Sequence, residues 1–186
     1  MELGGNIMQK LATTPKSSAK TYDLIITAML IALVFVSTML LNIKLPISAN
    51  GGLIHLGTAM LFISSILFGP KKGAMAGAFG MGLFDLVAGW TLWAPITFLT
   101  RGLQGYIIGK IAWSKGYNGN HFGVNLFAMI ISTPPMLAGY YIGEAMIFKS
   151  WIIPAASVPG DLVQTAIGIL VAIPACVALK KIRIFK

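Results

Sequence analysis

The chain has 186 residues, of which 56% are hydrophobic and only 10% are charged. Soluble domains carry about 25% charged residues, so this composition excludes an ordinary soluble protein and predicts an integral membrane protein. The net charge of +9 comes from short basic clusters between apolar segments, a distribution typical of membrane topology rather than of nucleic-acid binding. The single cysteine and the absence of CxxC or His-rich spacing predict no intrachain disulfide, no metal site and no cofactor.

The N-terminal residues 1–22 are polar, contain three lysines and have no apolar pattern, which predicts a disordered cytoplasmic tail. Residues 23–186 are expected to form a single membrane domain, an all-α, compact six-transmembrane-helix bundle. Its spans are expected at 23–43, 54–68, 73–87, 95–113, 122–148 and 160–179. The second and third spans are short for a hydrocarbon layer of about 30 Å.

The basic residues set the predicted orientation. With the N-terminus inside, the internal segments hold 11 of the 14 lysines and arginines. The positive-inside rule therefore predicts that both termini are cytoplasmic and that segments 44–53, 88–94 and 149–159 are external loops. These loops are apolar and carry Trp90, Trp93 and Trp151. They indicate either a lid over a site or an interfacial aromatic belt.

Polar side chains gather in the outer half of the predicted spans. Spacings of three or four residues place Arg101 with Gln104, Asp161 with Gln164, and Tyr140 and Tyr141 with Glu144 on shared helix faces. Polar groups in a bilayer cost several kcal/mol unless they face a partner or a cavity, so we interpret the cluster as a binding site. Its seven polar or ionisable members are His55, Asp85, Arg101, Gln104, Glu144, Asp161 and Gln164.

Structural roles are alternatives for several of these residues. His55 could cap the second span or hydrogen-bond its neighbours, and Asp161 could cap the sixth span. Asp85 could be only an ion-pair partner for Arg101, which itself could snorkel to the interface. Glu144 and Gln164 are the strongest candidates for ligand contacts.

The charge of the cluster restricts its ligand. Asp85, Glu144 and Asp161 oppose Arg101 alone, which leaves two negative charges if all are ionised. A small neutral or cationic heterocycle, stacked on tryptophan or tyrosine, fits better than a strong anion. The same carboxylates could form a proton relay. We expect an ion pair between Arg101 and Asp85 or Glu144.

Enzyme and ATPase motifs are missing. The segment most similar to a P-loop is GPKKGAMAG, but its glycines and lysines are in the wrong order. There is also no HExxH or GxSxG motif. The two histidines, His55 and His121, belong to opposite sides of the membrane in the predicted topology. The chain is therefore not expected to be an enzyme or to power itself with ATP.

Small residues four positions apart recur along the predicted spans and allow close helix contacts. Pairs such as Gly105 with Gly109 and Gly139 with Gly143 indicate internal packing. Ala28 and Ala32 lie in a first span that carries no buried charge, so they could instead contact another membrane subunit.

Several segments resemble one known family. They are AMLIA at 28–32, IHLG at 54–57, FGPKKGAMAGAFG at 68–80 and PGDLVQ at 159–164. In their order and spacing they are similar to the substrate-binding S component of an energy-coupling factor (ECF) vitamin transporter. The stretch FGPKKGAMAGAFGMGLFDLVAGW is most similar to the branch that includes riboflavin, hydroxymethylpyrimidine and vitamin B6 carriers.

The resemblance implies a function. It implies a multi-pass protein of the bacterial plasma membrane that binds a vitamin in an outer pocket and delivers it by reorienting in the bilayer. It implies a transmembrane T subunit in contact with Ala28 and Ala32, and two cytoplasmic ABC ATPases that supply power. We favour a vitamin B6 vitamer or hydroxymethylpyrimidine, with riboflavin as the alternative. A self-sufficient proton-coupled carrier and a structural membrane subunit are alternatives of another class.

Overall fold

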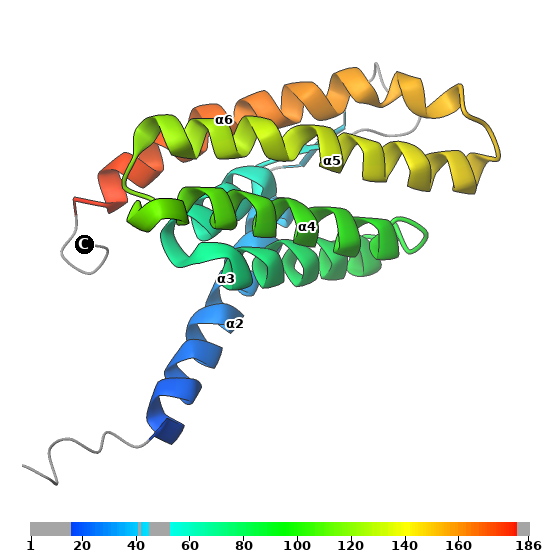
Figure 1. Ribbon diagram of the computed structural model, residues 1–186. Helices are drawn as coiled ribbons and strands as arrows, with labels where there is room; N and C mark the ends of the chain where they lie inside the picture. Colours follow the sequence, from blue (N-terminus) through cyan, green and yellow to red (C-terminus); the bar gives the residue numbers. More distant parts are fainter. Residues whose placement is uncertain (1–15, 41, 45–52, 182–186) are drawn as a thin grey trace, which may run out of the picture.

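The computed structural model describes residues 16–40, 42–44 and 53–181 (Figure 1). The α-helices are α2 (Lys16–Leu40), α3 (Gly57–Val87), α4 (Ala94–Ala112), α5 (Phe122–Phe148) and α6 (Val158–Leu179). Short 3-10 helices, η1 (Ser114–Gly116) and η2 (Ile153–Ala156), precede α5 and α6, respectively. Most of α3 runs alongside α4, and α5 and α6 form a neighbouring pair, whereas the N-terminal part of α2 projects away from them.

The fold is that of an all-α membrane protein. Three helical segments are long and apolar enough to cross a bilayer: Lys20–Leu40, Phe122–Phe148 and Ile153–Leu179. They correspond to the predicted first, fifth and sixth spans. The described part of the chain contains five α-helices, because α3 covers both the second and third predicted spans. The count of six spans and the cytoplasmic position of both termini remain predictions.

A break divides α3 at Gly69. Its φ of 83° and ψ of −175° are not helical, and a positive φ of this size favours glycine. Pro70 follows, and proline is well suited to the first turn of a new helix because its missing N–H needs no intrahelical partner there. The Gly-Pro pair therefore separates the two parts of α3 at the place where the sequence predicted a turn.

Two features near the N-terminus differ from the predictions. Helix α2 begins at Lys16, so it includes residues that were assigned to the disordered tail; residues 1–15 lie outside the described part. The first predicted external loop is bounded by an antiparallel pair of strands, β1 (Asn42–Lys44) and β2 (Leu53–His55), with Ile43 opposite Ile54. The strand pair holds His55 close to the start of α3.

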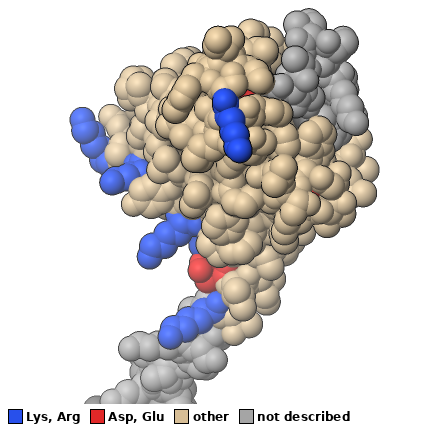
Figure 2. All heavy atoms as spheres, turned by 90° about the vertical axis from the view of Figure 1, so that its right-hand side faces the viewer, with Lys and Arg blue, Asp and Glu red and all other residues tan. Residues whose placement is uncertain are grey.

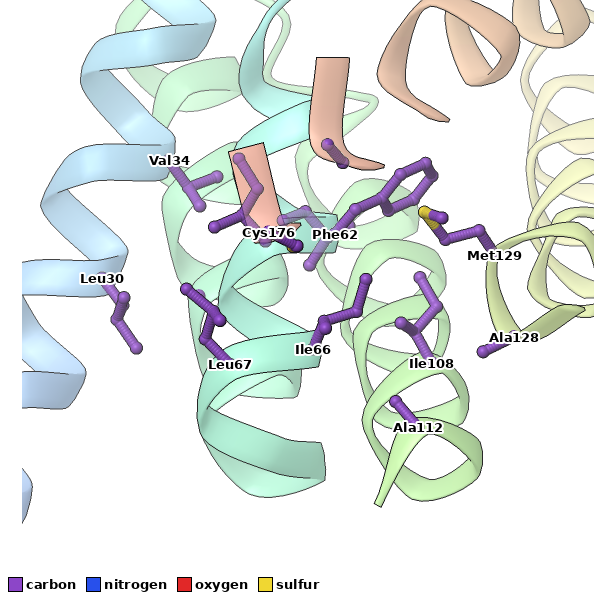
Figure 3. Packing of buried hydrophobic residues seen from close by; sticks show 14 of the residues in the cluster. Leu30, Val34, Phe62, Ile66, Leu67, Ile108, Ala112, Ala128, Met129 and Cys176 are labelled. Atoms are coloured by element: carbon purple, nitrogen blue, oxygen red, sulfur yellow. The ribbon is translucent and has the colours of Figure 1, made fainter. Parts of the chain in front are cut away.

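The apolar core lies where α3 meets α2, α4, α5 and α6, with Leu30 and Val34 of α2 among its members (Figure 3). Phe62 and Ile66 on α3, Ile108 on α4 and Met129 on α5 are completely inaccessible to solvent, and Cys176 on α6 is 4% exposed. Side chains from helices far apart in the sequence therefore fill one interior. This interior fixes the register of the helices that also carry the polar cluster.

Small residues allow these helices to approach closely. A Cβ atom at Gly77 would lie 2.5 Å from the Arg101 carbonyl oxygen, and one at Gly109 would lie 2.5 Å from Pro70. At Gly143 a Cβ atom would lie 2.5 Å from the Ile96 side chain. The α3–α4 and α4–α5 contacts thus require glycine, and these pairs serve internal packing as predicted.

Candidate functional site

Arg101 organises a polar network between α4 and α5. Its side chain is 3% exposed, its Nε donates a hydrogen bond to the Tyr140 hydroxyl at 3.2 Å, and a terminal nitrogen donates to Gln104 Oε1 at 2.9 Å. The guanidinium carbon also lies 5.2 Å from the centre of the Tyr140 ring, within cation–π range. Arg101 therefore points into the bundle, which argues against the alternative that it snorkels to the interface.

The network continues from Tyr140 to an acidic residue on α3. The Tyr140 hydroxyl donates to Thr97 Oγ1 at 3.1 Å, and the Thr97 side chain interacts with Asp85. Tyr140 and Thr97 therefore lie between Arg101 and Asp85. This differs from the predicted ion pair between Arg101 and Asp85 or Glu144: the described side-chain partners of Arg101 are neutral. The salt bridge that the described residues form joins Lys72 and Asp23.

Gln164 connects α6 to the start of α3. Its side chain is 4% exposed, and its Nε2 lies 2.9 Å from His55 Nε2 and donates to Thr58 Oγ1 at 2.7 Å. His55 does not cap α3, since the N-cap residue is Leu56. The contact with Gln164 brings together two residues that are 109 positions apart in the chain.

Glu144 and Asp161 lie near the turn between α5 and α6. The Glu144 side chain is 5% exposed and accepts a hydrogen bond from the Ser157 hydroxyl at 2.8 Å. The N-cap of α6 is Ser157, so Asp161 lies within the first turn of the helix and is not its cap. An acidic residue in this turn interacts favourably with the helix dipole.

Aromatic side chains tie the neighbouring loops together. The rings of Trp90 and Trp93 meet edge to face at 5.6 Å, and Trp93 lies 5.9 Å from Phe148 at the end of α5. The Tyr141 hydroxyl donates to the Trp151 backbone carbonyl. Figure 2 views the end of the molecule that carries these connections; its surface is mostly uncharged. Trp151 is 66% exposed, so its ring is available to a lipid interface as well as to a ligand.

Electrostatic interactions link several of these polar groups. The charge of Arg101 acts on His55, Asp85 and Asp161, and that of Glu144 acts on Asp161. Two buried atoms of these groups, His55 Nδ1 and Gln104 Nε2, lack a hydrogen-bond partner in the described structure, as do Ser64 Oγ, Asn125 Oδ1 and Thr165 Oγ1 elsewhere. Unsatisfied buried polar atoms are costly, and a polar ligand could satisfy them.

Sequence reasoning missed the hydroxyl partners. Thr58, Thr97 and Ser157 each bond to a predicted site residue, and all three are buried. Hydroxyl side chains are common in membrane helices and often bond to their own backbone, as Thr38 and Ser65 do here. Their residue type alone therefore gave no signal.

Within the described residues, no group of three His, Cys, Asp or Glu side chains could hold a metal ion.

Comparisons with known proteins identify the family. The model of the ECF-type riboflavin transporter S component matches residues 18–181. An uncharacterized protein of Pyrococcus woesei is 32% identical over 138 residues, which cover 74% of this chain and 88% of that protein. A protein named thiamine precursor transporter HmpT, from Lactococcus lactis subsp. cremoris, is 28% identical over 141 residues, or 76% of this chain and 77% of its own. The family model covers almost the whole helical part of the chain, which also holds charged groups inside a membrane bundle. The chain therefore belongs to the family of ECF-type riboflavin transporter S components.

Proposed function

We propose that the chain is the high-affinity substrate-binding subunit of an ECF importer and that the Arg101 network, with Gln164, Glu144 and Asp161, binds a small heterocyclic vitamin or vitamin precursor. The observation that carries this proposal is the buried Arg101, bonded to neutral Tyr140 and Gln104 while its charge acts on Asp85 and Asp161. Among the described residues Arg101 has no salt-bridge partner, and a buried charge in this position favours a ligand that completes its surroundings.

A pyrimidine or pyridine ring suits this site. Hydroxymethylpyrimidine and the B6 vitamers are small aromatic rings with hydroxyl and ring-nitrogen groups, which can pair with amides and carboxylates. Gln104 offers an unpaired Nε2 and His55 an unpaired Nδ1, and both atoms are buried. The relative named as a thiamine precursor transporter supports the pyrimidine. Riboflavin is the second candidate, favoured by the description of the family model.

Transport in this proposal depends on partner subunits. Ala28 and Ala32 are exposed on α2, beside the apolar residues Ile25 and Val36, which are also exposed. Small residues on such a face allow another helix to approach closely. We assign this face to a transmembrane T subunit, with two ABC ATPases on the cytoplasmic side of a bacterial plasma membrane. The loaded bundle then reorients in the membrane to release its ligand.

Binding of a vitamin panel to the purified chain tests the substrate. Hydroxymethylpyrimidine, pyridoxine and riboflavin are titrated separately by isothermal calorimetry in detergent. Nanomolar binding of one small ring, with riboflavin at least about a hundredfold weaker, supports the proposal; a difference of this size corresponds to about 2.8 kcal/mol. Nanomolar riboflavin binding with none for the small rings overturns the choice of substrate.

Uptake assays test the transporter class. The chain is expressed in cells with and without co-expressed T and ATPase subunits, and accumulation of the labelled ligand is measured. Uptake that requires all the subunits supports an ECF importer. Uptake by the chain alone, abolished by collapsing the proton gradient, would identify a self-sufficient proton-coupled carrier. Leucine in place of both Ala28 and Ala32 is expected to abolish uptake and leave ligand binding to the isolated chain unchanged.

A further inference from the structure

A second polar region lies far from the Arg101 network, where α2 leaves the rest of the molecule. A cavity of about 800 Å³ opens there between α2, the break in α3 and the end of α4. Lys20, Lys71 and Lys72 line it, together with Asp23 and apolar residues that include Trp113. Figure 2 shows basic side chains on either side of an acidic one in this part of the molecule.

The walls of this cavity combine positive charge with an apolar surface. Three lysines against one aspartate leave two net positive charges. The Asp23 carboxylate forms a salt bridge with Lys72, and its side chain remains 64% exposed. Leu24, Met75 and Phe68 supply apolar surface beside these charges. A ligand that carries a negative head and a hydrocarbon tail is complementary to both surfaces.

The break in α3 adds to the positive potential. Because Gly69 is not helical, the part of α3 that begins at Pro70 presents a new helix N-terminus inside the cavity wall. The N-terminus of a helix carries a partial positive charge and favours anions. Trp113, at the end of α4, forms the cavity wall opposite this helix N-terminus. Its indole nitrogen donates a hydrogen bond to the Ile66 carbonyl at 2.9 Å, and a Cβ atom on Gly69 would lie 3.4 Å from its ring.

The cavity is placed at a membrane surface by its own residues. Exposed apolar side chains continue along α2 from Leu24 to Met29 and Leu33, where they face the hydrocarbon layer of a spanning helix. Tryptophan and lysine at the end of such a helix are typical of the headgroup level. An acyl chain could therefore lie along α2 while its phosphate lies at the lysines.

We propose that this cavity binds the headgroup of an anionic phospholipid, with Lys20, Lys71 and Lys72 around the phosphate and Trp113 beside the glycerol region. Basic pockets between membrane helices are recognised sites for such headgroups. This site is separate from the vitamin site and does not depend on which vitamin is bound. Asp23 weakens it by competing for Lys72.

Tryptophan quenching by brominated lipids tests the proposal on the full chain. The protein is placed in nanodiscs that contain equal mole fractions of brominated phosphatidylglycerol or brominated phosphatidylcholine. We expect stronger quenching by the anionic lipid, and this difference should be lost when Trp113 is replaced by phenylalanine. Equal quenching by the two lipids in the unchanged protein would overturn the proposal, as would an undiminished difference after W113F.

Variants that remove lysines from the cavity test whether positive charge causes the preference for the anionic lipid. Lys71→Gln with Lys72→Gln should reduce the preference for phosphatidylglycerol by roughly fivefold for each lysine removed. Lys110→Gln with Lys115→Gln removes the same charge from exposed positions outside the cavity lining and should leave the preference unchanged.

Asp23→Asn should increase the preference because it removes the competing carboxylate. If the lysine variants fail to fold, this substitution still tests the site, since an unchanged or reduced preference contradicts the proposal. An equal loss of preference in the Lys110 and Lys115 variant would also contradict it.

Discussion

The same helices build two different interiors. Helix α4 contributes Ile108 to the apolar core and Arg101 to the polar network, and α6 likewise contributes Cys176 to the core and Gln164 to the network. The core is filled by apolar side chains from several helices, whereas the network joins polar groups and contains the unpaired Gln104 Nε2; Ser64 Oγ and Asn125 Oδ1 are also unpaired elsewhere in the described structure. Close packing stabilises a fold, and unsatisfied polar atoms favour a ligand. We propose that the first region serves stability and that the second serves ligand recognition.

Replacing Arg101 by methionine should have the largest effect on binding. The substitution removes the buried positive charge and its hydrogen bonds to Tyr140 and Gln104, and a hydrogen bond to a charged group contributes about 1.5–3 kcal/mol. We expect the affinity for hydroxymethylpyrimidine to fall at least about a hundredfold, measured by calorimetry. Lys110→Met removes the same charge from an exposed position on α4 and should leave binding unchanged. Equal affinities of R101M and the unchanged chain would show that the ligand does not bind at Arg101.

Replacing Phe62 by alanine should lower the stability of the protein and leave ligand binding nearly unchanged. Phe62 is inaccessible in the core, and truncation of a buried phenylalanine typically lowers the free energy of unfolding by about 3–5 kcal/mol. Thermal unfolding in detergent should detect this loss, while the affinity of the protein that remains folded changes less than about threefold. Phe127→Ala on α5 is a matched control because Phe127 is 56% exposed. A stable F62A protein with lost binding would contradict the division between the two regions.

Gly77 joins the two regions, so its replacement should affect both. A Cβ atom there would press on the Arg101 backbone carbonyl at 2.5 Å, and overpacking typically costs about 1–3 kcal/mol. Gly77→Ala should therefore lower the unfolding temperature and also weaken ligand binding by displacing α4. Gly82→Ala, where the nearest atom would be 3.5 Å away, is expected to change neither measurement. An unchanged unfolding temperature for G77A would show that α3 and α4 pack less closely than described.

Tyr140→Phe should have the smallest effect. It removes the hydroxyl that accepts from Arg101 and donates to Thr97 while keeping the ring, and the loss of these two hydrogen bonds costs about 1–2 kcal/mol. We expect a loss of affinity of roughly five- to thirtyfold in equilibrium binding. Tyr106→Phe changes an exposed tyrosine on α4 and should bind as the unchanged chain does. If Y140F and Y106F behave alike, the hydroxyl bridge does not contribute to binding.

The helical elements were accessible from the sequence because their signals are strong. Apolar runs punctuated by Gly and Pro gave the bounds of α5 at 122 and 148, and the Gly69–Pro70 pair marked the break in α3. The strand pair was missed because three-residue strands are too short to show an alternating pattern. Helix α2 was expected to start later because polar residues at the end of a membrane helix carry no apolar signal.

The polar residues of the candidate site could be singled out from the sequence, but the hydrogen bonds between them could not. Polar residues in an apolar chain are conspicuous, so Arg101 and Gln164 could be singled out. Their partners depend on helix rotation and depth, which spacing within one helix does not fix. The sequence therefore suggested a charge partner for Arg101, whereas the structure gives Tyr140 and Gln104. Resemblance to a family supplied the function, which no single motif in the chain encodes.

The most direct test of the central claim is an experimental structure of the purified chain with its tightest-binding vitamin. Our account predicts a ring enclosed near Arg101, with at least one polar atom within about 3.5 Å of the Gln104 or Gln164 side chain. It also predicts that His55 Nδ1 or Gln104 Nε2, both unpaired here, gains a partner. A ligand bound away from these residues, with the Arg101–Tyr140–Thr97 network unchanged, would contradict the account.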